Sequence, residues 1–328
     1  MQQRTLGKDG PVVSAIGLGC MGMSDFYGPA DDSESVATIQ EAIDRGVTLL
    51  NTGDFYGMGH NEFLLRRALE GRRDRVFLSV KFGALRTPEG RFVGFDGRPA
   101  AVKNFLAYSL KRLGTDHIDL YQPARVDPAV PIEETVGAIA DLVKAGHVRY
   151  LGVSEASAAT VERAAAVHPV AALETEYAVV TRDIEHETLP AVRALGVSVV
   201  AYGVLSRGLI GGASAGSFNS PGDFRAMLSP RFDAENLQQN LTVVDALARI
   251  AADLGLTVAQ LAIAWVLAQG EDIIPLVGAR RRERLSEALG ALDARLPADV
   301  LERIAAAVPP GAIAGDRYQP EGMAMVNR

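Results

Sequence analysis

Short apolar runs recur along this chain, and each is followed by a polar loop and then by a stretch with apolar residues three and four positions apart. Short apolar runs are typical of buried strands, whereas the wider spacing is typical of amphipathic helices. The pattern therefore predicts eight strand and helix units. The predicted strands begin at Val13, Val47, Val76, Ile118, Val148, Ala171, Val197 and Ile273.

The helical stretches include "SVATIQEAIDRG", "AAVKNFLAYSLKRLG", "PIEETVGAIADLVKAG" and "TVAQLAIAWVLAQG", each ending in the glycine that favours a helix exit. Alternating strands and helices indicate parallel pairing with right-handed crossovers. Eight units close naturally into an α/β fold of the (β/α)8 TIM-barrel type. We expect one domain over residues 1–328, with an irregular Pro- and Gly-rich tail at about 308–328.

A doubly wound open sheet is the competing architecture. Gly17, Gly19 and Gly22 match its GxGxxG phosphate-binding pattern. In that fold the helix begins directly after the glycines, but here the polar stretch "SDFYGPADDSES" intervenes. The pattern therefore favours the barrel.

Composition restricts the classes of function. The 328 residues carry a net charge of −7, which argues against nucleic acid or an anionic membrane as partner. Cys20 is the single cysteine, so neither an intramolecular disulfide nor a multi-cysteine metal site is expected. The N-terminus lacks the apolar core of a signal peptide, and no apolar run reaches about 18 residues, so we expect a cytoplasmic protein.

Polar residues gather where predicted strands end, which is where TIM barrels place their chemistry. Asn51 and Tyr56 follow the second strand, and Lys81 ends the third. Lys81 is either a rim lysine whose ammonium reaches solvent or a cation beside Tyr56. In the second case it would lower the pKa of Tyr56 and suit that phenol to proton donation.

An arginine cluster, "GARRRERLSEAL", follows the eighth strand. It is either a solvated helix face or a phosphate site, since barrels often bind phosphate beside a helix N-terminus after their last strands. Basic side chains at a helix N-terminus oppose the helix dipole, and a bound anion would relieve that conflict.

These residues resemble the aldo-keto reductase family over nearly the whole chain. Seven segments match family segments, in family order: "GLGCMGMS", "NTGDFYG", "SVKFG", "SLKRLGTDHIDLYQ", "GHVRYLGVSE", "AYGVLSRG" and "GARRRERLSEAL". The chain is similar to the bacterial branch of the family, in which the fifth strand ends in "GVSE". The resemblance implies an NADPH-dependent (β/α)8 barrel that reduces aldehydes or ketones to alcohols.

Two of the family's four catalytic positions are altered. The resemblance implies that Tyr56 is the proton donor and Lys81 its partner, but Asn51 stands where the family has Asp and Ala124 where it has His. Without an anion at position 51, we expect a lower pKa for Lys81. Tyr56 is then the main remaining donor, with His60, Arg125 or a water as candidates to compensate.

The cofactor positions are mostly retained. The resemblance places the nicotinamide amide at Ser154 and Glu155, the ring against Tyr202, and the adenosine 2′-phosphate at Arg284. Glu174 stands where a Gln is usual. The full set of implied NADP contacts is Gly19, Cys20, Met21, Ser154, Glu155, Glu174, Tyr202, Gly203, Leu205, Arg207, Gly208, Gly278, Ala279, Arg280, Arg284 and Glu287.

Three functions stay open. The leading interpretation is a carbonyl reductase with a reduced tetrad, acting on a small-molecule carbonyl or alcohol. The second is oxidation of a sugar or polyol by the same residues. The third is an NADPH-binding sensor or regulatory protein with negligible turnover. Phe82, Phe92 and Phe95 are either apolar walls of a substrate site or residues that pack the loop against the barrel. The Gly- and Ser-rich segment 206–228 is either a mobile lid or a disordered loop without a function.

Overall fold

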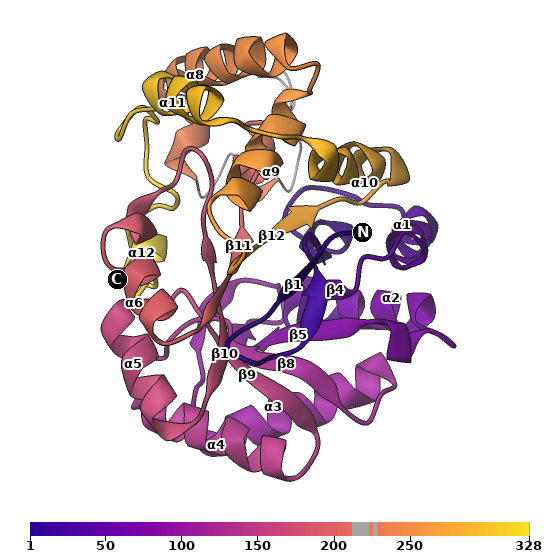
Figure 1. Ribbon diagram of the computed structural model, residues 1–328. Coiled ribbons are helices and arrows are strands. Elements are labelled where there is room, and N and C mark those ends of the chain that lie inside the picture. Colours follow the sequence, from indigo (N-terminus) through magenta and orange to yellow (C-terminus); the bar gives the residue numbers. More distant parts are fainter. Residues whose placement is uncertain (212–222, 226–228, 328) are drawn as a thin grey trace.

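Eight parallel strands form a closed barrel in the computed structural model, which describes residues 1–211, 223–225 and 229–327 (Figure 1). Around the barrel the order is β3, β4, β5, β8, β9, β10, β11 and β12, and β12 pairs with β3. This confirms the predicted (β/α)8 barrel, and the open-sheet alternative is wrong. The strands are β3 Gly17–Gly19, β4 Leu49–Gly53, β5 Phe77–Phe82, β8 Ile118–Pro123, β9 Val148–Ser154, β10 Val170–Glu176, β11 Ser198–Tyr202 and β12 Ile273–Gly278.

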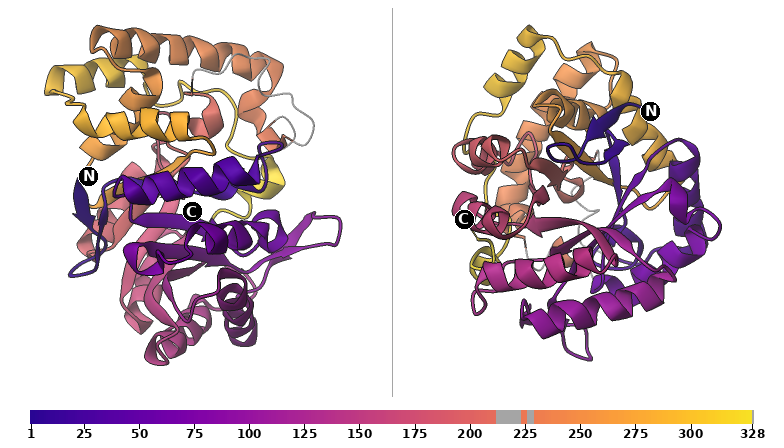
Figure 2. Two further views of the ribbon diagram at one scale, coloured as in Figure 1. Left: turned by 90° about the vertical axis from the view of Figure 1, so that its right-hand side faces the viewer. Right: turned by 60° about the horizontal axis from the view of Figure 1, so that its bottom comes forward.

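Helices surround the barrel, because each strand is followed by an amphipathic segment that buries its apolar face against the sheet (Figure 2). The helices are α1 Asp32–Asp44, α2 His60–Ala68, α3 Pro99–Leu113, α4 Ile132–Lys144, α5 Ala158–Val167, α6 Thr188–Ala194, α8 Ala234–Asp253, α9 Val258–Ala268, α10 Arg282–Leu289, α11 Ala298–Ala307 and α12 Pro320–Met323. Helices α8 and α11 pack side by side outside the ring, at the top of Figure 1.

The first predicted strand is divided into two. Residues Val12–Ser14 form β2, which pairs antiparallel with β1, Gln3–Thr5, and only Gly17–Gly19 enters the barrel. The Ser14 hydroxyl donates to the Ile16 carbonyl at 2.7 Å, which helps to end β2 there. Leu6 and Val13 pack in one apolar cluster with Leu49, Phe77, Leu120 and Ala172. The hairpin therefore lies against the barrel interior near the amino ends of the strands.

A second hairpin replaces the loop expected after the third barrel strand. It consists of β6, Ala84–Arg86, and β7, Phe92–Phe95. Phe82 is fully buried and stacks on Tyr121 with ring centroids 4.3 Å apart, so it is core and not a substrate wall. Phe92 is 39% exposed, and its ring lies 6.0 Å from that of Phe55, next to Tyr56.

The tail returns to the carboxyl ends of the barrel strands. Between Val308 and Asn327 its only regular element is the short helix α12. Asn327 donates its backbone N–H to the Glu155 carbonyl at 3.2 Å, just after β9. Much of the predicted lid, 212–222 and 226–228, lies outside the described residues.

No single helix among the described residues is both long and apolar enough to cross a membrane. Helices α8 and α9, bent by 85° at their junction, pass that test only as a pair and only by length and composition.

Candidate functional site

A layer of polar side chains crosses the barrel interior just above the apolar cluster. Lys81 is the last residue but one of β5, and its Nζ donates to Asn51 Oδ1 on β4 at 2.6 Å and lies 2.8 Å from Glu174 Oε1 on β10. Strands β5 and β10 are not neighbours, because β8 and β9 lie between them, so Glu174 reaches through the barrel interior to the lysine. All three side chains are at most 5% exposed.

The same layer binds the second carboxylate oxygen of Glu174. Asn51 Nδ2 donates to Glu174 Oε2 at 2.7 Å, and Gln122 Nε2 on β8 donates to that same oxygen. Both amides also donate to the Ser79 hydroxyl, at 3.2 and 3.3 Å. A Cβ on Gly152 would lie 2.7 Å from Gln122 Oε1, so glycine on β9 leaves room for the glutamine to extend inward.

This geometry corrects one expectation about Lys81. Asn51 does remove a negative charge from β4, but Glu174 supplies one, so Lys81 does not lack an anionic partner. The pKa of Lys81 is lowered, as expected, yet the main cause is burial; the Glu174 carboxylate acts in the opposite direction and raises it. The direction was right and the stated cause was wrong.

Tyr56 lies in the loop after β4, beside this polar layer. Its ring is 6% exposed and packs edge-on against Phe55 and Phe26, with centroids 4.7 and 6.2 Å apart. Lys81 Nζ lies 5.4 Å from the Tyr56 ring centroid. The loop is held by Asp25, which accepts from the Gly57 backbone N–H at 3.2 Å.

The pKa of Tyr56 differs from the expectation. Burial raises it well above the usual phenol value, and the Glu174 carboxylate raises it further, while Arg125 lowers it. The alternative in which Lys81 gives this phenol a lowered pKa therefore has the net shift in the wrong direction, because burial dominates. Tyr56 stays protonated at neutral pH, which is the form a proton donor requires.

Ala124 lies at the carboxyl end of β8 and is only 1% exposed. Arg125 follows it, donating to the Ala124 carbonyl at 2.7 Å and to the Tyr318 hydroxyl at 3.3 Å. His60 lies elsewhere, with its ring nitrogens 2.9 Å from Ser24 Oγ and 3.3 Å from an Asp32 oxygen. Of these two candidates to compensate for the missing His, Arg125 lowers the pKa of Tyr56, whereas the His60 ring contacts Ser24 and Asp32.

Ser154 and Glu155, at the end of β9, differ in how they are used. The buried Ser154 hydroxyl makes no hydrogen bond to the described part of the protein. Glu155 adopts a left-handed φ of 50° and accepts from the Tyr202 hydroxyl at 2.7 Å and the Glu176 backbone N–H at 2.9 Å. The Ser154 hydroxyl thus has no partner among the described residues, whereas the Glu155 carboxylate is already bound within the protein.

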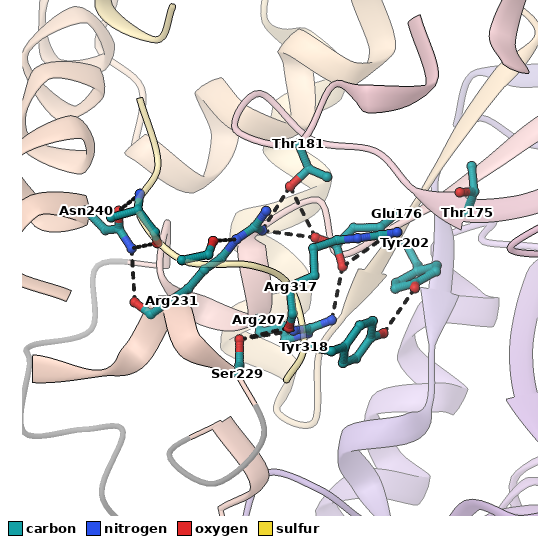
Figure 3. Close-up of polar contacts among 12 residues, drawn as sticks. Thr175, Glu176, Thr181, Tyr202, Arg207, Ser229, Arg231, Asn240, Arg317 and Tyr318 are labelled. Atoms are coloured by element: carbon teal, nitrogen blue, oxygen red, sulfur yellow. Dashed lines mark hydrogen bonds and ion pairs between the residues drawn. The ribbon is translucent and has the colours of Figure 1, made fainter. Parts of the chain in front are cut away.

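The tail closes an ionic network on this side of the mouth (Figure 3). Arg317 donates to both Glu155 oxygens at 3.1 and 3.2 Å, and Arg207 donates to Glu176 at 3.1 Å. Tyr318 places its ring 4.4 Å from the Arg207 guanidinium carbon and its hydroxyl 3.3 Å from that of Tyr202, toward which it points in Figure 3. Two residues expected to contact cofactor, Tyr202 and Arg207, are therefore positioned by the tail.

Burial alone would raise the pKa of the Glu155 carboxyl. The guanidinium groups of Arg317 and Arg125 outweigh that effect and lower its pKa to about 2. The negative charge of Glu155 in the folded protein therefore depends mainly on Arg317, which lies about 160 positions later in the chain.

The arginine cluster begins α10, and its members have different partners. Arg280 donates to the carbonyls of Tyr27 and Pro29 at 3.1 and 3.0 Å, which leaves it structural. Arg282 pairs with Glu34. Arg284 is half exposed and pairs with Glu287 at 2.7 Å. The N-cap residue Arg281 makes no side-chain cap, but the Glu34 carboxylate accepts from the Arg282 backbone N–H at 3.1 Å, so this carboxylate already occupies the first turn of α10.

The remaining predicted contacts lie around the same mouth. Gly19 and Gly278 are register partners on β3 and β12, with Cys20 and Met21 following the first and Ala279 the second. Gly203, Leu205 and Gly208 lie in the loop after β11. Burial raises the pKa of the Cys20 thiol to about 12, which makes it an unreactive core residue. The sequence interpretation missed Ser79, Gln122 and Arg317, although Gln122 stood in a strand next to the altered His position.

Comparison with known proteins is consistent with this geometry. The family model described as "Aldo/keto reductase family" matches residues 15–309. The aldo-keto reductase yakc [NADP(+)] of Schizosaccharomyces pombe is 39% identical over 323 residues, covering 97% of this chain and 94% of that protein.

Two solved structures are also similar. The glycerol dehydrogenase AKR11B4 from Gluconobacter oxydans aligns with a TM-score of 0.83 at 29% identity, covering 94% of this chain and 96% of that one. An aldo/keto reductase from Klebsiella pneumoniae, in complex with NADP and acetate, aligns with a TM-score of 0.75 at 26% identity, covering 97% and 99%.

The tail network generates a stability prediction. Replacing Arg317 with Met keeps most of its stem but leaves the buried Glu155 carboxylate without its strongest cation, which should cost about 3–5 kcal/mol at neutral pH. The folded pKa of Glu155 is depressed, so its contribution is present above about pH 4.5 and is lost as the pH falls toward 2. The deficit of the variant should therefore shrink over that range in urea unfolding experiments.

Arg303→Met is the matched control, because Arg303 pairs with Asp253 at the exposed surface. Its effect should stay below about 1 kcal/mol. A similar loss for both variants, or a deficit for Arg317→Met that does not change with pH, would contradict the assignment.

Proposed function

The chain belongs to the aldo/keto reductase family, and from this premise we propose that it is an NADP-dependent oxidoreductase that interconverts carbonyl compounds and alcohols, with Tyr56 as proton donor. The observation that carries the proposal is the pairing of a buried, protonated Tyr56 with Lys81, 5.4 Å from its ring centroid, at the carboxyl ends of β4 and β5. In a TIM barrel this end of the strands holds the chemistry.

The residues present fit a nicotinamide dinucleotide. The Ser154 hydroxyl is buried with no partner among the described residues, and a carboxamide would satisfy it. At the other end of the site, the half-exposed guanidinium of Arg284 suits a phosphate. Tyr202 at the end of β11 and Arg207 in the loop after it would also contact the cofactor. When bound, NADPH supplies the hydride.

Tyr56 performs the proton transfer in this proposal. The carbonyl oxygen becomes an alkoxide as the carbon receives hydride, and the Tyr56 hydroxyl gives that oxygen its proton. An alkoxide is a stronger base than a phenolate, so a phenol with a raised pKa still donates to it. The reverse reaction needs a deprotonated Tyr56, which burial opposes, so the raised pKa favours carbonyl reduction over alcohol oxidation at neutral pH.

The altered tetrad favours one alternative, an NADPH-binding sensor or regulatory protein with negligible turnover. Ala124 cannot polarise a carbonyl, and its methyl group is buried rather than lining an open gap. The exposure of Ala124 therefore gives no support to a pocket for a bulky ketone at this position. Retention of both Tyr56 and Lys81 argues for the enzyme.

The substrate class follows from the rim around Tyr56. Phe26, Phe55 and Phe92 pack against one another there, with centroids of the Phe26–Phe92 and Phe55–Phe92 pairs 5.9 and 6.0 Å apart. Such a rim suits a carbonyl compound with an apolar or aromatic substituent. A single functional unit over residues 1–328 and a cytoplasmic location stay predictions, and the oligomeric state is open.

Tyr56→Phe tests the donor. The change keeps the ring and removes the proton, so NADPH consumption with an activated aromatic aldehyde should fall by about 10²–10⁴-fold. NADPH binding, followed by quenching of protein fluorescence, should stay within a few-fold of the parent. Tyr108→Phe, at an exposed position on α3, is the control and should be neutral. If Tyr56→Phe keeps a turnover near that of the parent, another group is the proton donor. If the parent itself shows no turnover, the result favours the NADPH-binding sensor or regulatory protein.

Arg284→Ala tests the cofactor preference. A charge-assisted contact to the 2′-phosphate contributes roughly 1.5–3 kcal/mol, so NADPH affinity should weaken by about ten- to a hundredfold. NADH lacks this phosphate, and its affinity should not change. Arg295→Ala, an exposed arginine after α10, is the matched control. Equal weakening for both cofactors would refute a 2′-phosphate role for Arg284.

A further inference from the structure

The Lys81 ammonium has two short polar contacts in the described structure, and both lie within the barrel. One is the neutral Asn51 oxygen at 2.6 Å, and the other is the Glu174 carboxylate at 2.8 Å. An ammonium carries three N–H donors, so one remains with no acceptor among the described residues. The Tyr56 ring lies over this nitrogen. Glu174 and Asn51 therefore fix the position of the Lys81 ammonium beside the Tyr56 ring.

A buried ammonium without an anion is costly, because desolvation favours its neutral form. The charged groups that act on Lys81 are Glu174 from β10, Arg125 from the loop after β8 and Cys20 from the end of β3, and Tyr56 lies over it. Burial keeps Cys20 in its neutral thiol form, Tyr56 is a neutral phenol, and Arg125 repels the lysine. Glu174 is the one anion in this set.

The hydrogen bonds of Glu174 also account for the amide at position 51. Asn51 accepts from Lys81 through Oδ1 and donates to Glu174 through Nδ2 at 2.7 Å. An aspartate at position 51 would accept from the lysine equally well, but it would place a second carboxylate against Glu174. An asparagine at position 51 thus suits a glutamate at 174, and an aspartate at 51 would suit a glutamine at 174.

We propose that Glu174 is a positioning residue that supplies the counter-charge of Lys81, an inference that rests on the proposed function. The anion beside the lysine is then the Glu174 carboxylate on β10, and the neutral amide is that of Asn51 on β4. Three of the roughly four acceptor sites of its carboxylate are taken by Lys81, Asn51 and Gln122. Glu174 therefore acts through the lysine. A role as a direct cofactor contact would require it to give up one of these bonds or to use its last acceptor site.

An exchange of charge between the two positions tests the proposal. Four proteins are compared: the parent, Glu174→Gln, Asn51→Asp, and the double variant with both changes. Glu174→Gln leaves Lys81 without an anion, so kcat for an activated aromatic aldehyde should fall by at least about tenfold. The basic limb of its kcat–pH profile should move to lower pH, because the lysine then loses its proton earlier.

Asn51→Asp alone should also lose activity and stability, since two carboxylates then face each other around one ammonium. The double variant should recover both the basic limb of the profile and most of kcat. Its activity should exceed the product of the two single effects by at least about tenfold, which corresponds to a coupling of about 1.4 kcal/mol. A double variant that follows the product of the single effects, or a Glu174→Gln variant with parental kcat and pH profile, would overturn the proposal.

Asp119→Asn is the matched control. Asp119 is also buried on a barrel strand and pairs with Arg73 and Arg149, at 2.7 and 2.9 Å. It is the second residue of β8, whereas Lys81 lies near the end of β5. The control should lower the unfolding midpoint and leave the kcat–pH profile in place. If it shifts the profile as Glu174→Gln does, the effect is general destabilisation and the proposal fails.

The same proteins separate this proposal from the proposed function. If the parent consumes no NADPH with any carbonyl, the proposed function fails, and the pairing is then judged by urea unfolding of the four proteins. A double variant more stable than the two single losses predict supports the pairing of Glu174 with Lys81, and additive losses refute it.

Discussion

The buried ion pair between Lys81 and Glu174 is the interaction on which the candidate site depends. Its two partners are 2.8 Å apart and come from β5 and β10, which are separated by β8 and β9. Such a pair gains little net stability, because both ions lose their hydration on burial. Its value is positional: with Asn51, Ser79 and Gln122 it forms one connected hydrogen-bond layer directly below Tyr56. A change to any member leaves a buried polar group without its partner.

Two networks therefore frame the mouth of the barrel. The polar layer positions Lys81 under the proton donor, and the tail network positions Tyr202 and Arg207 on the other side. The tail acts through Arg317, whose guanidinium determines the pKa of Glu155, and through Tyr318, which contacts Tyr202 and Arg207. Ser154 lies at the end of β9. Its hydroxyl is buried and has no hydrogen-bond partner among the described residues. Most polar groups at the mouth are thus fixed before any ligand binds.

The barrel itself could be predicted from periodicity, because every strand and crossover helix satisfies a local pattern. The N-terminal hairpin could not, since Val13 and Leu18 belong to one apolar run and only the turn after Ser14 divides it. The sequence also indicated Tyr56, Lys81 and the changes at 51 and 124. It could not reveal that Glu174 faces Lys81, because that contact joins residues 93 positions apart across a closed sheet. When each position is considered separately, Asn51 indicates that the negative charge beside Lys81 is missing. In the structure that charge is supplied by Glu174 on β10.

The protonation of Lys81 is the most direct test of this account. Labelled lysine Cε carbons report it by NMR, with the Lys81 signal assigned by its loss in Lys81→Met, and no cofactor or substrate is needed. The Glu174 carboxylate raises the pKa of Lys81 against the effect of burial, so the account predicts a lower Lys81 pKa in Glu174→Gln than in the parent. An unchanged Lys81 pKa would contradict it, because Glu174 would then not be the counter-charge.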